Sequence, residues 1–234
     1  MQNTCTEIKK INFVDLPCFD LMPNLLKEVG KPYRSLGMMF KDFAQSLTSG
    51  IEEEFNQGLV KVTHSYMGIP VRSELINNNL KESISDYFSD YFKTRAFKPT
   101  IYRTHPTALP SAQTLDNINP KEYWISELWH SDNEPNNVTR LIIYLDDVID
   151  DGDSPFEYYD DSENNIGEYN YANNKIDGGW KKSRFFNLEE DKKIKVYGPK
   201  YSSFIFHPNM IHKANFARAK KRDVISINLH HLTK

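Results

Sequence analysis

The sequence predicts an α+β protein, mainly β, in which a helical part comes first and an antiparallel β domain follows. Two observations carry this prediction. Apolar residues recur at helical spacing before about residue 97, and short strand-like runs separated by turn-forming residues come after it. This order is typical of an α+β fold, or of a β-sandwich or barrel with added helices. We expect one domain over residues 1–234, because that length suits a single hydrophobic core, although it would also allow two small domains.

Two apolar stripes predict helices within residues 1–96, a part that we expect to be mostly helical. Their members are spaced three or four positions apart, so each stripe lies along one face of a helix. The first stripe is Leu36, Phe40, Phe43, Leu47, Ile51 and Phe55, and the second is Ile76, Leu80, Ile84, Tyr87 and Tyr91. We expect both faces to support the β domain as part of the core.

Five segments within residues 97–234 predict strands. They are "TIYRT" from 100, "VTRLIIYL" from 138, "KIKVYG" from 193, "SSFIFH" from 202 and "DVISINLHH" from 223. In the last segment Ile225, Ile227 and Leu229 alternate with other residues, so they share one face of the strand. The spacing of the segments predicts antiparallel β structure around one core.

A long acidic segment interrupts these strands. Nine of the eighteen residues from Asp146 to Glu163 are acidic, and a stretch rich in Asn, Gly and Tyr follows. We expect a long loop over about residues 149–192, which is either a lid over a binding site or a solvated acidic insert.

The composition argues against several classes of protein. No stretch has the ~18 apolar residues that a membrane helix needs, and no apolar run of signal-peptide type begins the chain, so we expect a cytoplasmic protein. The net charge of −3 argues against a protein that binds nucleic acid by neutralising phosphates. Cys5 and Cys18 have no CxxC context and cannot form a disulfide framework. None of these features predicts an oligomeric state.

A histidine and a carboxylate two residues apart, His130 and Asp132, occur in "LWHSDNEPNN" at 128–137. At the end of a strand, side chains two apart point to the same side and can reach one ion, although the pair could also be surface groups. A second imidazole could come from His207 or His212, which both follow a strand-like run. Two histidines and one carboxylate leave three positions open on an octahedral iron, as oxygen activation requires.

Arg222 follows His212 by ten residues and opens the last predicted strand. An α-keto acid that chelates iron through its keto and C1 carboxylate oxygens leaves a second carboxylate at its far end. The planar guanidinium of arginine binds a carboxylate through two parallel hydrogen bonds. An arginine at this position would be placed to hold such a co-substrate, although Arg222 could also be one more charge of the basic cluster in a solvated turn.

Three blocks of the sequence resemble the signature blocks of the phytanoyl-CoA dioxygenase-like family. They are "WHSDNEPNNVTRLIIYLDDV", "SPFEYY" and "FHPNMIHKANFARAKKRDV", and they lie within residues 129–229. Members of this family are Fe(II)- and 2-oxoglutarate-dependent oxygenases built on a double-stranded β-helix, a cupin-like jelly roll. The resemblance implies that His130, Asp132 and His212 bind the iron, in preference to His207. It also implies that Arg222 binds the C5 carboxylate of 2-oxoglutarate.

The resemblance implies further contacts and has two departures. The family's Pro-Gly and terminal His after "FEY" are absent, which affects substrate contacts rather than the metal. Val224 stands where some related oxygenases have a hydroxyl residue, so a second contact to 2-oxoglutarate must come from elsewhere. For that contact we expect Tyr102 and Arg103. The aromatic residues that we expect to line the substrate pocket are Trp129, Tyr144, Phe156 and Tyr158.

These expectations describe a dioxygenase that uses Fe(II), 2-oxoglutarate and O2 to hydroxylate a C–H bond and releases succinate and CO2. The presence of Asp132 leaves no open position for a halide, which favours hydroxylation over halogenation. We expect a small-molecule substrate, free or tethered to a carrier, and neither a nucleic acid nor a membrane as partner. Two alternatives are a cupin-like metal enzyme that does not use 2-oxoglutarate and a catalytically silent β-helix that serves as a binding module.

Overall fold

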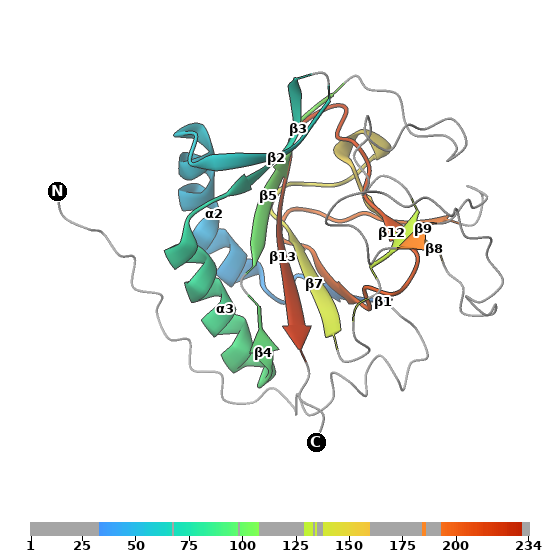
Figure 1. Ribbon diagram of the computed structural model, residues 1–234. Coiled ribbons are helices and arrows are strands. Elements are labelled where there is room, and N and C mark those ends of the chain that lie inside the picture. Colours follow the sequence, from blue (N-terminus) through green and yellow to red (C-terminus); the bar gives the residue numbers. More distant parts are fainter. Residues whose placement is uncertain are drawn as a thin grey trace.

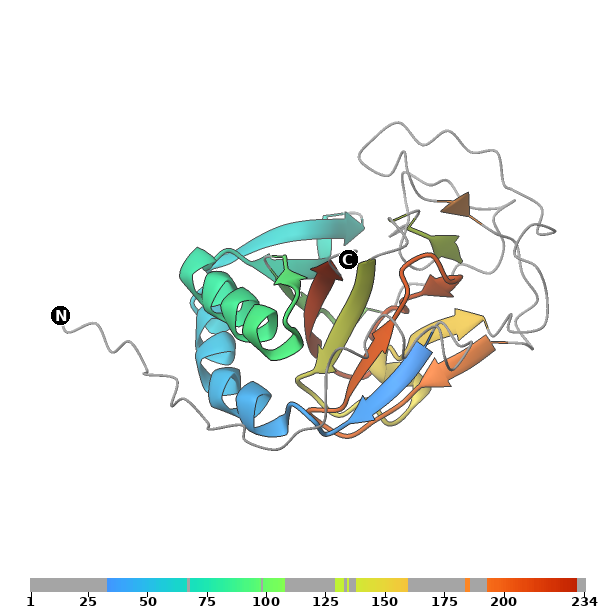
Figure 2. The ribbon, with the colours of Figure 1, turned by 90° about the horizontal axis from the view of Figure 1, so that it is seen from below.

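Two antiparallel sheets face each other, and two helices cover the outer side of the larger sheet (Figure 1). The computed structural model describes residues 33–66, 68–97, 99–107, 129–132, 134, 138–159, 184–185 and 193–230. In Figure 2 the helices lie on one side of the larger sheet and the smaller sheet lies on the other. This arrangement confirms the predicted jelly-roll architecture with supporting helices.

The elements of the first part are β1 (Tyr33–Gly37), α2 (Lys41–Asn56), β2 (Val60–Tyr66), β3 (Ile69–Leu75), α3 (Asn78–Phe92) and β4 (Arg95–Ala96). Those of the second part are β5 (Thr100–Thr104), β6 (His130–Ser131), β7 (Val138–Tyr144), the 3₁₀ turn η4 (Asp151–Asp153), β8 (Phe156–Tyr159), β9 (Arg184–Phe185), β10 (Lys193–Val196), β11 (Ser203–Phe206), β12 (His212–Lys213) and β13 (Arg222–His230). All five predicted strands are present, as β5, β7, β10, β11 and β13.

The larger sheet has the order β1-β11-β7-β13-β5-β3-β2, with β4 paired to β13, and the smaller sheet has the order β10-β8-β12-β6-β9. Successive side chains of β13 point to opposite faces of the larger sheet, so they belong to two separate hydrophobic cores. Ile225, Ile227 and Leu229 share one face, as predicted from their spacing, and this face packs against the helices. Val224 points to the other side, where it packs with Phe156 and other residues between the two sheets. The space between the sheets is therefore the interior in which a site can be built.

Helix α2 buries the predicted stripe from Phe43 to Phe55, while Phe40 stands at its N-cap position and Leu36 belongs to β1. Both of these residues still pack against the core, because the turn between β1 and α2 keeps them on the same side. The apolar stripe was therefore predicted correctly as core, although the helix begins later than the stripe.

Helix α3 begins at the N-cap Asn77, whose side-chain oxygen accepts a hydrogen bond from the backbone N–H of Leu80 at 3.0 Å. Ile76 precedes the helix and is 53% exposed, so its assignment to the buried stripe was wrong. The buried face continues instead from Ile84 at four-residue intervals to Phe88 and Phe92. The predicted Tyr87 and Tyr91 are partly buried beside it.

The prediction that residues 1–96 are mostly helical was wrong for the described part, because strands alternate there with the two helices. β2 and β3 form a hairpin that turns at Gly68, whose φ of +80° favours glycine, and β3 pairs with β5. β1 pairs with β11 at the other edge of the sheet. The first part of the chain therefore supplies strands to the larger sheet as well as helices.

The acidic segment begins as ordered structure rather than as loop. Within the expected loop 149–192, η4 has a capping box in which Asp150 and Asp153 each bind the other's backbone N–H, and β8 joins the smaller sheet. Residues 160–183 and 186–192, in which the rest of the expected lid falls, lie outside the described residues. No helix in the described ranges is long and apolar enough to cross a membrane.

Candidate metal centre and co-substrate pocket

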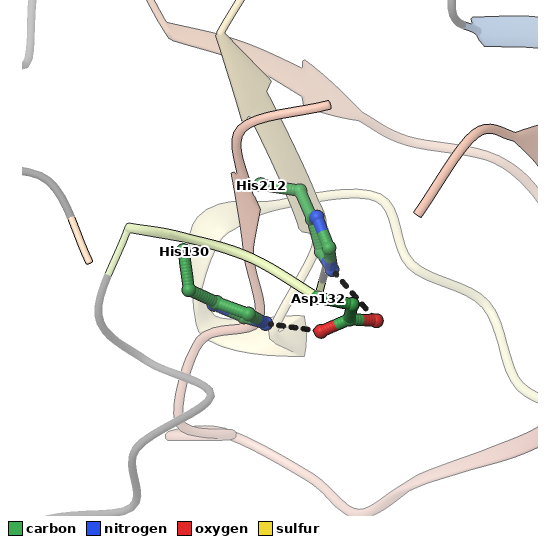
Figure 3. Close-up of side chains that lie close together, drawn as sticks. All are labelled: His130, Asp132 and His212. Atoms are coloured by element: carbon green, nitrogen blue, oxygen red, sulfur yellow. Dashed lines mark ion pairs between the residues drawn. The ribbon is translucent and has the colours of Figure 1, made fainter. Parts of the chain in front are cut away.

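Three side chains predicted as metal ligands converge at the smaller sheet (Figure 3). His130 on β6 and His212 on β12 are directly paired in register, and Asp132 follows β6. The Nε2 atom of His130 lies 3.5 Å from Asp132 Oδ1, and that of His212 lies 4.0 Å from Asp132 Oδ2. One donor atom from each residue lies within 4.8 Å of the other two. Residues that are far apart in the sequence thus form one potential coordination site.

The orientation of His212 leaves one ring nitrogen available to a metal. Its Nδ1 lies 2.9 Å from the carbonyl oxygen of Met210, which can only accept, so Nδ1 carries the proton and Nε2 has the lone pair. The rings of Phe156 and Phe206 lie 5.5 and 5.1 Å from the imidazole. Burial, together with nearby His130, lowers the pKa of His212 to about 3. The imidazole is therefore neutral at neutral pH, as a metal ligand must be.

Asp132 is ionised and in contact with a cation. Burial alone would raise its pKa, but Arg140, His212 and His130 outweigh that effect and hold the pKa at about 2. Arg140 NH1 lies 2.6 Å from Oδ2. Even so, Oδ2 is buried and accepts no well-aligned hydrogen bond from the described residues. The carboxylate of Asp132 is therefore negatively charged beside the two imidazoles, as the carboxylate ligand of a metal ion must be.

The donor set fits a divalent transition-metal ion. Two imidazole nitrogens and one carboxylate oxygen are the ligands of the non-heme Fe(II) oxygenases, in which three coordination positions stay open. His207, the alternative ligand, is not part of this group; its Nδ1 accepts a hydrogen bond from the backbone N–H of Asn209 at 3.1 Å. The geometry therefore favours His212, as the resemblance implied.

Arg222 lies in the interior between the sheets and is only 2% exposed. Its NH1 donates to the carbonyl oxygen of Ser154, whereas its buried Nε has no hydrogen-bond partner among the described residues. Thr104 stands directly opposite it on β5, and the buried Thr104 hydroxyl likewise has no partner in the part of the chain that the structure describes. No carboxylate among the described residues forms an ion pair with Arg222. Because an isolated buried charge is costly, the Arg222 guanidinium is suited to an anionic partner.

The predicted aromatic residues Phe156, Tyr144 and Tyr158 lie in the same interior. The Tyr144 hydroxyl donates to the carbonyl oxygen of Val196 and accepts from the N–H of Phe156, both at 3.0 Å, so it ties the two sheets together. Burial raises its pKa. Its ring also lies 5.9 Å from the Arg222 guanidinium, and Phe156 lies beside His212. These contacts connect Arg222 to the candidate metal ligands.

Two predicted site residues lie on the wrong side of their sheets. Arg103 forms two 2.8 Å hydrogen bonds to Asp223 on the helix-covered face, because strand alternation points it away from Arg222. Trp129 packs with Tyr159 and Ile211 on the side of the smaller sheet opposite His130, so it does not line the interior. The prediction of Arg103 as a co-substrate contact and of Trp129 as a pocket residue was wrong for this reason.

Tyr102 does face the interior, paired in register with Val224, and the guanidinium of Arg72 stacks on its ring at 3.6 Å. Its role as a co-substrate contact stays a prediction. Sequence reasoning missed Thr104 and Arg140. Alternation along "TIYRT" and "VTRLIIYL" could have found both, since it places Thr104 on the face of Tyr102 and Arg140 on that of Tyr144.

No family profile and no curated protein matches this sequence, whereas solved structures do. The non-heme α-ketoglutarate-dependent epimerase SnoN from nogalamycin biosynthesis has a TM-score of 0.57 at 9% identity, over 90% of this chain and 85% of SnoN. A prolyl hydroxylase from Trichoplax adhaerens has a TM-score of 0.53 at 13% identity, over 91% of this chain and 88% of the hydroxylase. HygX from Streptomyces hygroscopicus, with nickel, 2-oxoglutarate and hygromycin B bound, has a TM-score of 0.52 at 9% identity, over 88% of this chain and 85% of HygX.

At these identities the likeness concerns the fold. The resemblance to the phytanoyl-CoA dioxygenase-like family stays a prediction, because no family profile matches. The chain adopts the double-stranded β-helix fold found in 2-oxoglutarate-dependent non-heme metal enzymes.

Proposed function

We propose that this protein is an Fe(II)- and 2-oxoglutarate-dependent dioxygenase that hydroxylates a C–H bond of a small molecule. The observation that carries the proposal is the convergence of His130, Asp132 and His212, with donor atoms within 4.8 Å of one another. Arg222 supports the choice of co-substrate, because it places a buried cation without a carboxylate partner, among the described residues, in the same interior.

In this proposal His130, Asp132 and His212 hold the iron, and Arg222 holds the C5 carboxylate of 2-oxoglutarate. Thr104 lies opposite Arg222, and its hydroxyl has no hydrogen-bond partner among the described residues, so in this proposal it supplies the second contact that Val224 cannot make. When bound, the iron and its co-substrate supply the oxygen activation that protein side chains cannot carry out. The protein's own contribution is to orient these groups and the substrate.

Several neighbouring side chains exclude water from the proposed reaction site. Phe156 and Phe206 cover the His212 imidazole, and Tyr158, stacked on Tyr33 at 4.7 Å, extends this apolar wall. A water-poor interior favours reaction with a bound substrate over side reactions with solvent. We propose Phe156 and Tyr158 as substrate contacts on this basis, and a small-molecule substrate, like the hygromycin B bound in HygX.

Anaerobic titration tests this proposal. Fe(II) and then 2-oxoglutarate are added to the purified protein, and the visible charge-transfer band of an iron–2-oxoglutarate chelate is recorded. We expect the band in the wild type, its absence in Asp132→Ala, and iron binding with weakened 2-oxoglutarate binding in Arg222→Met. Slow release of succinate from 2-oxoglutarate in air would then demonstrate turnover.

The same titration distinguishes the two alternatives. Iron binding without the band, together with full activity of Arg222→Met on some substrate, would indicate a cupin-like metal enzyme that does not use 2-oxoglutarate. Failure of the folded wild type to bind Fe(II) at all would indicate a β-helix that serves as a binding module.

A further inference from the structure

Arg140 connects the larger sheet to the carboxylate of the candidate metal ligand Asp132. Its NH1 lies 2.6 Å from Asp132 Oδ2, and its Nε donates a 2.8 Å hydrogen bond to Asn228 Oδ1. A guanidinium has donors that point in several directions, so one side chain can bind both groups at once. Asn228, Arg140 and Phe206 form one row across β13, β7 and β11.

This contact differs from an ordinary surface ion pair. The side chains of Arg140 and Asp132 are only 22% and 10% exposed, so solvent screens the pair weakly. Arg140 is anchored on a central strand of the larger sheet, and the Phe206 ring lies 5.9 Å from its guanidinium. Asp132 follows a strand of only two residues, and its backbone N–H donates to the carbonyl oxygen of Pro208 at 3.1 Å. Through Arg140, the larger sheet thus holds the carboxylate of Asp132, which follows a strand of the smaller sheet.

The chemical consequence concerns how Asp132 can bind a metal. A carboxylate binds a cation through one oxygen or through both, and the second mode occupies one more coordination position. A guanidinium held against Oδ2 leaves Oδ1, on the side of His130 Nε2, as the ligand atom. We propose that Arg140 and Asn228 are positioning residues that hold Asp132 for ligation through a single oxygen. This inference rests on the proposed function, which needs open positions for 2-oxoglutarate and O2.

A purely structural or a purely electrostatic role for Arg140 would give different results. If the pair with Asp132 only fastened the two sheets, its loss would lower the stability of the metal-free protein and leave the metal affinity of the folded protein unchanged. If Arg140 acted only through its positive charge, removing that charge would strengthen binding of a cation, and the neutral Asn228 would have no effect.

The test measures metal binding in Arg140→Gln and Asn228→Ala. Co(II) is titrated calorimetrically into the metal-free protein, and the visible d–d spectrum of the complex reports the coordination number. We expect both variants to bind Co(II) about 10- to 100-fold more weakly, the usual effect of losing a group that orients a metal ligand. We also expect the d–d spectrum of the Co(II) complex to change in the same direction in both variants. Arg34→Gln, an exposed arginine on the edge strand β1, is the matched control and should bind as the wild type does.

Asn228→Ala is the decisive variant, because it changes no charge. Wild-type Co(II) affinity and spectrum in folded Asn228→Ala and Arg140→Gln would overturn the inference, as would tighter binding in Arg140→Gln. We further expect the double variant to be little worse than either single variant, because the two residues act through one contact. Arg140→Lys keeps the charge but cannot bridge both partners. Its Co(II) affinity should therefore lie between those of the wild type and Arg140→Gln. Failure of the wild type to bind Co(II) would instead overturn the proposed function.

Discussion

His130 and His212 lie directly opposite each other on the adjacent strands β6 and β12, with ring centroids 4.3 Å apart (Figure 3). Directly opposed residues in an antiparallel pair point to the same face, so the strand pairing itself brings the two imidazoles together. Each of these strands has only two residues. A metal bound by both histidines would therefore cross-link the least extensive part of the smaller sheet.

Metal binding should stabilise the protein. A ligand at about 100 times its Kd adds roughly 2.7 kcal/mol, which corresponds to an increase in Tm of about 5 to 10 °C for a domain of this size. We expect this increase with Mn(II) in a thermal unfolding experiment and its reversal by EDTA. His212→Ala should abolish the increase. His207→Ala is the matched control: whatever its own Tm, it should keep the increase, and loss of the effect there would place the ligand at His207.

Removal of the guanidinium of Arg222 should weaken binding of 2-oxoglutarate and leave metal binding intact. Truncating one partner of a buried charge pair costs roughly 2 to 5 kcal/mol, so the Kd of 2-oxoglutarate should rise about 30-fold or more in Arg222→Gln. Thr104→Val removes one hydrogen bond to a charged group and should raise this Kd about tenfold. Both constants can be measured by calorimetry with Mn(II) present. Unchanged binding in both variants would show that the co-substrate, if bound, lies elsewhere.

Arg103→Gln should affect stability rather than binding. It leaves Asp223, which is buried on the helix-covered face, without its two hydrogen bonds from Arg103, although Lys221 still contacts that carboxylate. We expect the free energy of unfolding, measured with urea, to fall by roughly 3 kcal/mol. The 2-oxoglutarate affinity of the folded variant should match the wild type. A selective loss of that affinity would restore the prediction that Arg103 contacts the co-substrate.

Local patterns in the sequence were enough to predict the five strands and the two helices, and to single out His130 and Asp132 as candidate ligands. Alternation on β13 and the His-x-Asp spacing both involve residues close together in the chain. The hairpin of β2 and β3 was missed because its pattern is incomplete: Val62 and Ile69 are exposed, and Arg72 occupies a partly buried position. Its strand character depends on pairing with β5, a tertiary contact.

The environment of the candidate ligands could not be predicted in the same way. The contact of Arg140 with Asp132 depends on the distance between two sheets, and the row of Thr104 and Arg222 depends on strand register. A one-residue change in register exchanges the two faces of a strand. Alternation already puts Arg103 and Thr104 on opposite faces of β5, but the register with β13 decides which of the two faces Arg222 shares, and Arg103 is on the other one.

Acid should destabilise the protein through half-buried His64 on β2, away from the candidate metal ligands. Burial, with a contribution from Arg72, lowers its pKa from 6.5 to about 4. Between these values the unfolded chain binds a proton that the folded protein does not. The stabilisation is therefore complete above pH 6.5 and is lost as the pH falls toward 4, with a slope of at most about 1.4 kcal/mol per pH unit. Urea unfolding in EDTA measures the free energy of unfolding at pH 7 and at pH 5. Between these two pH values it should fall less for His64→Gln than for the wild type. Equal losses would mean that His64 titrates alike in both states and that other groups cause the acid sensitivity.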